Sequence, residues 1–517
     1  MGLQRILKLC NHAGETTFLQ NGKKLLTVVR NASTNAKPDL TSVRYKIERG
    51  PYATLNEAHL QFFKNTLDDN RVITDPEECE SYNVDWIKMV RGNSRLVLKP
   101  KTTEEVSKIL KYCNENRLAV CPQSGNTGLV GGSVPVFDEI VLSMKLMDRI
   151  ISTDELSGSV ACEAGCVLES LETHLAQYGL MMPLDLGAKG SCLIGGNIST
   201  NAGGLRLLRY GNLHGNVLGI EAVKANGEVI DCMNTLKKDN TGYHIKNLFI
   251  GSEGTLGVVT KVAIQCPTKA LSTNVAFLGL TDYENVLKVV RLAKRELAEI
   301  LSSCELMDKE SLDATTGNLG LRSPLSGEAH NFYMLIETAG SKQTHDEEKL
   351  SSFVEKALSD GLIEDGTMTG EPAKIKNIWD LRERVAEGVM RDGYCFKYDV
   401  SLPLSHFYEI IELLRERLTN LNVVRINGFG HLGDGNLHVS VSTKAYDAEV
   451  EDKLEPFIFE FVSKLRGSVS SEHGIGFKKA KYLRLSKEPG AIALMHQIKR
   501  MMDPNGILNP YKVVYPM

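Results

Sequence analysis

The sequence lacks a long apolar run, an excess of charge of either sign and closely paired cysteines. No stretch of the 517 residues reaches the roughly 18 consecutive apolar residues of a membrane span, so no transmembrane segment is expected. The net charge is -4, which gives no reason to expect nucleic acid as a partner. Eleven cysteines are scattered without a CxxC pair, which favours free thiols in a reducing compartment. What remains is a globular chain of two or three domains with 42% hydrophobic residues.

Acidic residues are also scarce before Asp39. Glu15 is the only one there, against six basic residues: Arg5, Lys8, Lys23, Lys24, Arg30 and Lys37. Basic N-termini that are rich in Ser and Thr and poor in acids are typical of mitochondrial transit peptides. We therefore predict a targeting segment in residues 1–44 and a location in the mitochondrial matrix. An ordinary disordered basic tail is the alternative.

The stretch Gly428–His438 carries two histidines around an Asp-Gly pair, which is a strong signal for a two-residue hairpin turn. With Asp434 and Gly435 at the centre of the turn, His431 is predicted directly opposite His438. Their Cβ atoms would then lie about 4.5–5.5 Å apart, close enough to share one metal ion. Two His with Glu472 as third ligand and one open position are typical of a catalytic metal site, and zinc is the expected ion. The alternative is a hairpin with two unrelated surface His.

Three segments are dense in glycine: residues 122–133, 183–204 and 251–257. Glycines allow successive backbone N–H groups to face one concavity, and such a nest binds phosphate oxygens. The first segment has its glycines at 125, 128, 131 and 132, which matches neither the dinucleotide fingerprint nor a P-loop. No Rossmann motif is identified, so NAD is not expected as the electron acceptor. Tight turns without a ligand are the alternative for any one segment taken alone.

Periodicity and capping signals predict the remaining elements. Helices are expected at residues 54–68, 102–116, 283–296, 346–358, 372–392 and 491–502, and strands at 118–121, 275–278, 332–336 and 395–402. Residues 217–231 are predicted to form a hairpin that turns at Asn226-Gly227. The alternation of strands and helices after residue 273 predicts an open sheet with helices on one side.

Arg382 falls in the middle of the apolar stripe of the helix predicted at residues 372–392. A guanidinium there is costly unless it is paired, and Arg is well shaped to hold a carboxylate through two hydrogen bonds. A substrate carboxylate and a buried Asp or Glu are both possible partners. Lys397 shares a face of the next strand with Asp399, and alternation alone predicts a solvated face for the two.

The three glycine-rich segments, in this order, resemble the FAD-binding domain of the vanillyl-alcohol-oxidase-type flavoproteins. The motifs at Gly430–His438, Ser471–Gly474 and Asp503–Pro510 resemble the branch of this family that holds the D-lactate and D-2-hydroxyglutarate dehydrogenases. The resemblance covers residue 80 to the end. It implies an α+β fold with a two-subdomain FAD-binding domain at residues 45–272 and an α+β cap domain for the substrate at residues 273–460. Residues 461–517 would complete the active site and return to the flavin domain.

The resemblance also implies a cofactor and its contacts. Some members attach FAD through a His in the first loop, but this loop has Asn126 and Thr127 and no His, so FAD is expected to be non-covalent. The implied cofactor-binding residues are Pro122, Ser124, Gly125, Asn126, Thr127, Gly128, Gly131, Gly132, Ser133, Gly190, Ser191, Gly195, Gly196, Asn197, Thr200, Gly203, Gly204, Glu253, Gly254, Gly257 and Asn509.

The implied reaction is oxidation of D-2-hydroxyglutarate to 2-oxoglutarate, with electrons passed to an electron-transfer flavoprotein. His473 would be the general base, although His473 as ligand and Glu472 as base is the open alternative. The substrate would contact Arg382, Lys397, Asn436, Ala386 and Ser440. The last two depart from the family pattern, which has a hydroxyl residue and an Asn there.

Other functions are kept open. D-lactate or another D-2-hydroxy acid could be the substrate, and a non-redox FAD transferase, such as the ether-lipid synthases of the same fold, is a competing class. A flavin-free metallohydrolase is a third reading. A purely structural protein would not explain Arg382 together with three glycine-rich segments. The sequence does not reveal the quaternary state, for which a homodimer is one alternative.

Overall fold

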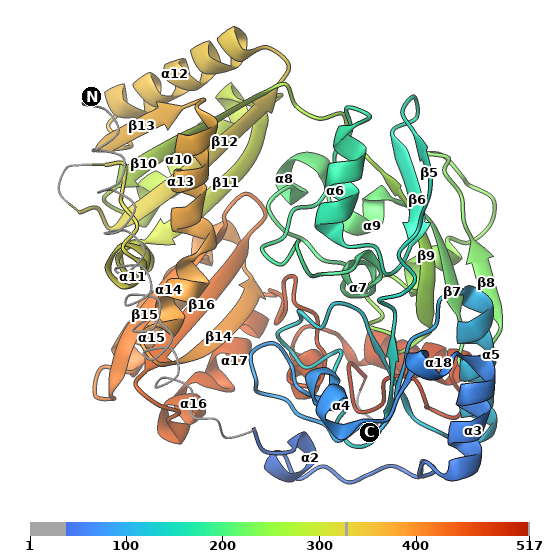
Figure 1. The fold of residues 1–517 in the computed structure, drawn as a ribbon. Coiled ribbons are helices and arrows are strands. Elements are labelled where there is room, and N and C mark those ends of the chain that lie inside the picture. Colours follow the sequence, from blue (N-terminus) through green and yellow to red (C-terminus); the bar gives the residue numbers. More distant parts are fainter. Residues whose placement is uncertain (1–37, 326–328, 515–517) are drawn as a thin grey trace, which may run out of the picture. The chain divides into compact units, whose positions relative to one another are not determined.

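Three β-sheets follow one another along the chain in the computed structural model, which describes residues 38–325 and 329–514 (Figure 1). All three lie in the unit that begins at Leu40. Most of the predicted targeting segment lies outside the described residues; within residues 38–44 the chain forms the short helix α2 (Thr41–Arg44). No helix among the described residues is long and apolar enough to cross a membrane.

The first sheet has four short strands. Their order is β1 (Val72–Ile73), β2 (Val97–Leu98), β4 (Ile140–Ser143) and β3 (Val120–Gln123), and all pairs but β1–β2 are parallel. The helices of this part are α3 (Glu57–Thr66), α4 (Pro76–Asn83) and α5 (Thr103–Glu115). Thr102 caps α5 by accepting the backbone N–H of Glu105, which confirms the predicted helix start. Apolar side chains of α3 and α5 pack with those of β2 and β4.

The second sheet is antiparallel and has five strands. Their order is β5 (Ile150–Asp154), β6 (Ser159–Glu163), β9 (Val258–Gln265), β7 (Val217–Val223) and β8 (Val229–Cys232). The hairpin predicted at Asn226-Gly227 joins β7 to β8. The helices here are α6 (Leu168–Ala176), α7 (Ile194–Thr200), α8 (Leu207–Tyr210) and α9 (Leu213–Asn216).

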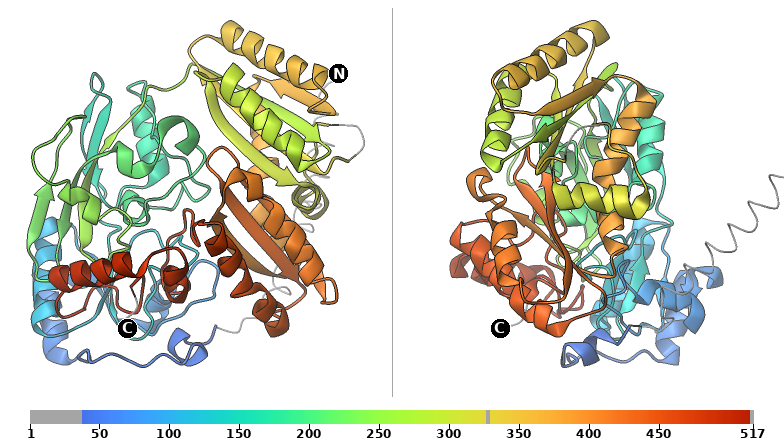
Figure 2. Two further views of the ribbon diagram at one scale, coloured as in Figure 1. Left: turned by 180° about the vertical axis from the view of Figure 1, so that it is seen from behind. Right: turned by 90° about the vertical axis from the view of Figure 1, so that its left-hand side faces the viewer.

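The third sheet has seven antiparallel strands and carries the histidine hairpin. Their order is β13 (Asp365–Thr369), β10 (Ser272–Leu280), β12 (Phe332–Gly340), β11 (Leu301–Asp308), β15 (Val423–His431), β16 (Asn436–Thr443) and β14 (Tyr394–Ser401). Figure 2 shows this sheet from two further sides.

Helices cover both faces of this sheet, so the prediction of helices on one side is wrong. One face packs against α10 (Tyr283–Glu296), α12 (Gln343–Ser359), α15 (Glu409–Arg417), α16 (Ala448–Leu454) and α17 (Phe457–Lys464). The other packs against α11 (Lys309–Leu319), α13 (Pro372–Glu383) and α14 (Val385–Met390). The reason is visible in β10, where neighbouring residues are buried on both faces instead of alternating with polar ones.

The helix predicted at residues 372–392 is also interrupted. Arg384 leaves helical geometry between α13 and α14, and α14 packs against α11 where Gly388 meets the backbone of Ala314. The chain ends with α18 (Pro489–Met502) and then returns to the first sheet, where Leu508 pairs with Val120 of β3. The end of the described chain therefore lies against the first sheet.

Candidate functional site

The hairpin at Gly428–His438 forms, but its register differs from the predicted one. His431 pairs with Asn436, and Phe429 pairs with His438. The turn has four residues, Leu432 to Gly435, because buried Leu432 packs into the core and the N–H groups of Asp434 and Gly435 both donate to the carbonyl of His431. The slip amounts to two residues, so both His stay on one face as diagonal neighbours, with ring centroids 5.4 Å apart.

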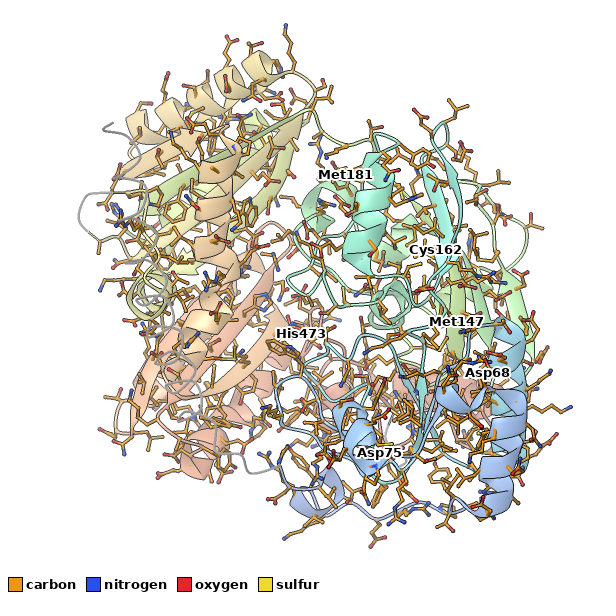
Figure 3. All side chains as sticks on the ribbon, viewed as in Figure 1. Asp68, Asp75, Met147, Cys162, Met181 and His473 are labelled. Carbon is orange, nitrogen blue, oxygen red and sulfur yellow. The ribbon has the colours of Figure 1, made fainter. Side chains whose placement is uncertain are left out.

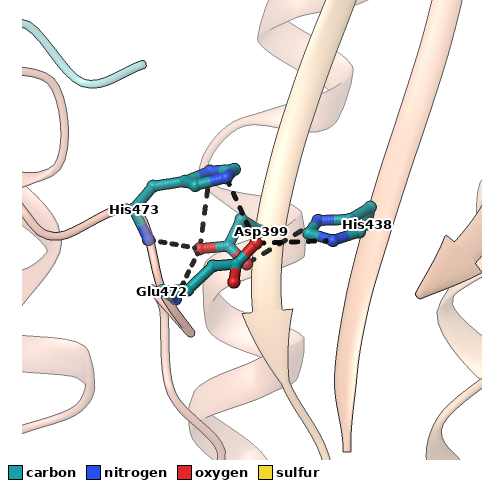
Figure 4. Close-up of side chains that lie close together, drawn as sticks. All are labelled: Asp399, His438, Glu472 and His473. Carbon is teal, nitrogen blue, oxygen red and sulfur yellow. Dashed lines mark hydrogen bonds and ion pairs between the residues drawn. The ribbon is translucent and has the colours of Figure 1, made fainter. Parts of the chain in front are cut away.

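Three imidazoles meet at one oxygen of Glu472. The Nε2 atoms of His473, His438 and His431 lie 3.6, 3.7 and 4.0 Å from Glu472 Oε1. The other carboxylate oxygen, Oε2, accepts the backbone N–H of Gly204 at 3.0 Å. This leaves Oε1 facing the three rings, and Figure 4 shows two of them.

Carboxylates also stand behind the rings. Glu305 lies 3.0 Å from His431 Nδ1, and Asp399 lies 3.8 Å from His438 Nδ1 and 3.6 Å from His473 Nδ1. A carboxylate at Nδ1 favours the tautomer that leaves Nε2 free to bind a metal or a proton. Burial alone would lower the pKa of His431, but Glu305 raises it to about 9.

The donor set fits a divalent metal. Imidazole Nε2 atoms and one carboxylate oxygen are the ligands that zinc takes in catalytic sites. Among the described residues, ligand atoms of Asp399, His438, Glu472 and His473 lie within 4.8 Å of one another. Asp399 is an orienting group in this set, because its Oδ2 accepts the N–H groups of Ser471, Glu472 and His473 and its Oδ1 accepts the amide of Asn436.

The loop that carries Glu472 and His473 is held from two sides. The backbone N–H groups of Ser471, Glu472 and His473 donate to Asp399 of β14 at 3.0 to 3.1 Å. Glu253, from the third glycine-rich segment, binds the N–H groups of Ile475 and Gly476 at 2.7 and 2.8 Å. Burial would raise the pKa of Asp399, but His473 and Lys479 hold it well below its usual range. The side chain of His473, labelled in Figure 3, is 26% exposed.

A cavity of about 500 Å³ adjoins this loop and is lined by all three glycine-rich segments. Most of the implied cofactor residues line it; the exceptions are Gly131, Gly190, Gly203, Gly204 and Asn509. The second segment contains α7, although glycine at this density disfavours a helix. Gly196 of α7 has no room for a Cβ, which would lie 2.9 Å from the Cβ of Ser124. The first and second segments therefore pack directly on each other.

Three of these exceptions, Gly203, Gly204 and Asn509, make structural contacts outside the cavity. Gly204 has a φ of +89° and gives its N–H to Glu472, while Gly203 lies beside the same carboxylate. Asn509 donates to the carbonyls of Gly132 and Glu253 and so ties the C-terminal segment to two glycine-rich segments. Glu253 lines the cavity, but its two carboxylate oxygens accept the backbone N–H groups of Ile475 and Gly476.

Arg382 already has an acidic neighbour. Its Nη2 lies 2.9 Å from Glu305 Oε2, both side chains are at most 5% exposed, and the guanidinium lies over the ring of Phe429. The buried salt bridge left open by the sequence is therefore present. Nε and Nη2 of Arg382 are buried without a hydrogen-bond partner among the described residues, so the contact with Glu305 is an ion pair that leaves these donors unused.

Lys397 lines a second cavity, of about 960 Å³, which His473 also borders. It makes no hydrogen bond or ion pair with another described residue, and burial lowers its pKa. Ser440 lies opposite it on β16 and is buried. Ala386 belongs to α14 and packs at the edge of the core on that face of the sheet. The side-chain amide of Asn436 donates to Asp399. The solvated face that alternation predicted is wrong for Asp399, which is 1% exposed.

Three residues of the site were not assigned a role from the sequence: Glu305, Asp399 and Trp86, which lines the 500 Å³ cavity. A signal existed for Glu305, since it is an acid inside the run Leu301–Met307, which is otherwise uncharged. The letters G-x-G-x-x-G also occur, at residues 428–433. They run along β15 into a turn that leads to a strand, whereas the dinucleotide fingerprint leads into a helix.

Comparison with known proteins identifies the family. Residues 94–233 match the family described as FAD binding domain, and residues 270–513 match FAD linked oxidases, C-terminal domain. Mitochondrial D-2-hydroxyglutarate dehydrogenase of Bos taurus is 52% identical over 92% of this chain and 87% of its own length. The chain belongs to this dehydrogenase family. It is an FAD-dependent oxidoreductase, as predicted. It is also 48% identical, over 92% of this chain and 94% of the other, to a mitochondrial protein of Schizosaccharomyces pombe provisionally named a D-lactate dehydrogenase.

Solved structures support the fold of this family member. p-Cresol methylhydroxylase superposes with a TM-score of 0.71 at 16% identity, covering 88% of this chain and 96% of the other. Alkyldihydroxyacetonephosphate synthase gives 0.69 at 15% identity, over 90% and 86%. The predicted α+β fold of the vanillyl-alcohol-oxidase type is confirmed.

The lining of the 500 Å³ cavity predicts that the flavin is released on denaturation. Some family members bond FAD through a His in the first glycine-rich segment. Among the described residues of that segment that line the cavity, none is a His or a Cys. Unfolding in guanidinium chloride followed by desalting should leave all the yellow colour in the small-molecule fraction. Colour that elutes with the denatured chain would contradict this, and peptide mapping would then locate the bond.

The two-sided hold on the loop predicts a large stability cost for Asp399→Asn. Replacing a buried carboxylate that three backbone N–H groups and Lys479 surround should lower the free energy of unfolding by about 3 to 5 kcal/mol. Asp360→Asn removes a surface ion pair with Lys356 and should cost less than about 1 kcal/mol. Urea denaturation of both variants measures the difference. Similar small losses would show that Asp399 does not hold the loop.

Proposed function

We propose that this protein oxidises D-2-hydroxyglutarate to 2-oxoglutarate in the mitochondrial matrix, with non-covalent FAD and a divalent metal, zinc. The observation that supports this best is the convergence of three imidazole Nε2 atoms on Glu472 Oε1. Two of these residues, Glu472 and His473, line the 500 Å³ cavity, which we assign to the flavin and call the flavin-side cavity. The name of the Bos taurus relative supports the same substrate.

In this proposal His431, His438 and Glu472 hold the metal. In each of these side chains, the atom that would not bind the metal already has a neighbour. Nδ1 of His431 lies 3.0 Å from Glu305, and Nδ1 of His438 lies 3.8 Å from Asp399. Oε2 of Glu472 accepts the backbone N–H of Gly204. When bound there, a divalent ion lowers the pKa of a coordinated hydroxyl and orients a carboxylate beside it.

His473 takes the proton of the C2 hydroxyl at Nε2. Its Nδ1 faces Asp399 Oδ2 at 3.6 Å, and this carboxylate stabilises the imidazolium that forms. His473 borders the flavin-side cavity, so the carbon that loses its hydrogen is held on that side. FAD held between the glycine-rich segments would supply the acceptor for that hydrogen, as a hydride.

Arg382 and Lys397 hold the distal carboxylate. Arg382 retains a free Nε donor beside Glu305, and Lys397 faces the second cavity with no carboxylate partner among the described residues. With both carboxylates and the hydroxyl held, the two isomers would present their C2 hydrogens to opposite sides, and we expect the D-isomer to present its hydrogen to the flavin-side cavity. Electrons then pass to an electron-transfer flavoprotein.

D-lactate is the second candidate substrate. Ala386 and Ser440 stand where the family pattern has a hydroxyl residue and an Asn, so two polar groups are missing or shortened near the distal end of the substrate. A smaller substrate needs fewer polar contacts there.

Metal removal gives the first test of the proposed chemistry. Dialysis against a chelator should abolish turnover and leave flavin absorbance and circular dichroism unchanged, because the ion serves catalysis. His431→Ala and His438→Ala should each lower kcat by more than the 10- to 100-fold typical of outer-shell partners. His406→Ala, an exposed His paired with Glu409, is the matched control and should keep its activity. Near-normal activity of His431→Ala without added metal would rule out the proposed ligand set.

Lys397 gives the test of substrate size. A hydrogen bond to a charged group contributes about 1.5 to 3 kcal/mol. Lys397→Met should therefore lower kcat/KM for D-2-hydroxyglutarate about 10- to 100-fold, with little effect on D-lactate, which has a methyl group at that end. Lys464→Met, at an exposed Lys of α17, is the control. Equal losses on the two acids would remove the dicarboxylate assignment.

A further inference from the structure

Glu305 occupies a position between the two ends of the proposed substrate site. It lies on β11, where it pairs across the sheet with His431 of β15. Its side chain is 2% exposed. One oxygen, Oε2, lies 2.9 Å from Arg382 Nη2 and 3.0 Å from His431 Nδ1. The other, Oε1, accepts the hydroxyl of Ser303 at 2.8 Å and lies 3.1 Å from His431 Nδ1.

Each contact has a separate physical effect. Toward His431, the carboxylate accepts the Nδ1 proton, which fixes the ring plane and leaves Nε2 as the free nitrogen. Toward Arg382, it supplies the charge without which a buried guanidinium would be strongly destabilising. Ser303 fixes the carboxylate itself. A single buried group therefore sets the direction of an imidazole and of a guanidinium together.

We infer that Glu305 is a positioning residue that couples the metal end of the site to the distal-carboxylate end. Because both His431 and Arg382 are anchored on one carboxylate, the spacing between the metal and the guanidinium is fixed before the substrate binds. A fixed spacing favours a dicarboxylate of one length over a monocarboxylate. This inference rests on the proposed ligand role of His431 and the proposed substrate role of Arg382.

The experiment compares Glu305→Gln with Glu337→Gln. Glu337 lies on the neighbouring strand β12 and accepts a hydrogen bond from Trp379 of α13, the helix that carries Arg382, but it contacts no proposed metal ligand. Zinc affinity is measured on the flavin-loaded proteins by competition with a chromogenic chelator, without turnover. The ratio of kcat/KM for D-2-hydroxyglutarate to that for D-lactate is then measured at saturating zinc.

Glu305→Gln should bind zinc 10- to 100-fold more weakly than the wild type. At saturating zinc its preference for the dicarboxylate should still fall at least tenfold, because Arg382 has lost the group that orients it. Glu337→Gln should change neither quantity. If Glu305→Gln binds zinc within threefold of the wild type, or regains the full preference once zinc is saturating, the coupling is overturned.

A second variant covers the case in which Glu305→Gln does not fold, as judged by flavin content and melting temperature. Glu305→Asp keeps the charge but shortens the side chain by one methylene, so the carboxylate cannot keep both contacts at their present lengths. It should lose zinc affinity or dicarboxylate preference by at least fivefold; wild-type values for both would overturn the inference. Zinc binding is measured without substrate, so a failure of the inference is distinguishable from an inactive wild type, which would refute the proposed function.

Discussion

Two buried carboxylates hold the loop Ser471–Gly476, and the site depends on that hold. Asp399 comes from the seven-stranded sheet and Glu253 from a glycine-rich segment that lines the flavin-side cavity. Together they accept five backbone N–H groups of one short loop. Hydrogen bonds to charged acceptors are about twice as strong as neutral ones, and leaving buried donors unpaired is costly. Glu472 and His473 are therefore placed by the sheet and by a glycine-rich segment at once.

The same arrangement explains why some glycines do not line the flavin-side cavity. The second glycine-rich segment faces that cavity with Ser191, Gly195 and Asn197, and a few residues later it gives the N–H of Gly204 to Glu472. A single segment thus lines the 500 Å³ cavity at one end and contacts a proposed metal ligand, Glu472, at the other.

Local signals in the sequence predicted many elements and failed where partners come from distant strands. Helices such as α10 and α5 follow from caps and apolar periodicity, which are properties of neighbouring residues. The partner of Arg382 could not be predicted in this way, because Glu305 is 77 positions away and reaches it only through the packing of α13 on the sheet. The burial of Asp399 was missed for the same reason: strand alternation does not reveal what covers a face.

The hairpin shows how far the pairing of two strands can shift without separating the two histidines. A strand presents every second residue to one face, so a slip of two positions left His431 and His438 on the same side. A slip of one would have turned one imidazole away. A change in the length of the turn therefore leaves the pair together as long as the two strands keep their pairing, whereas a one-residue shift of one strand against the other would place the two imidazoles on opposite faces of the sheet.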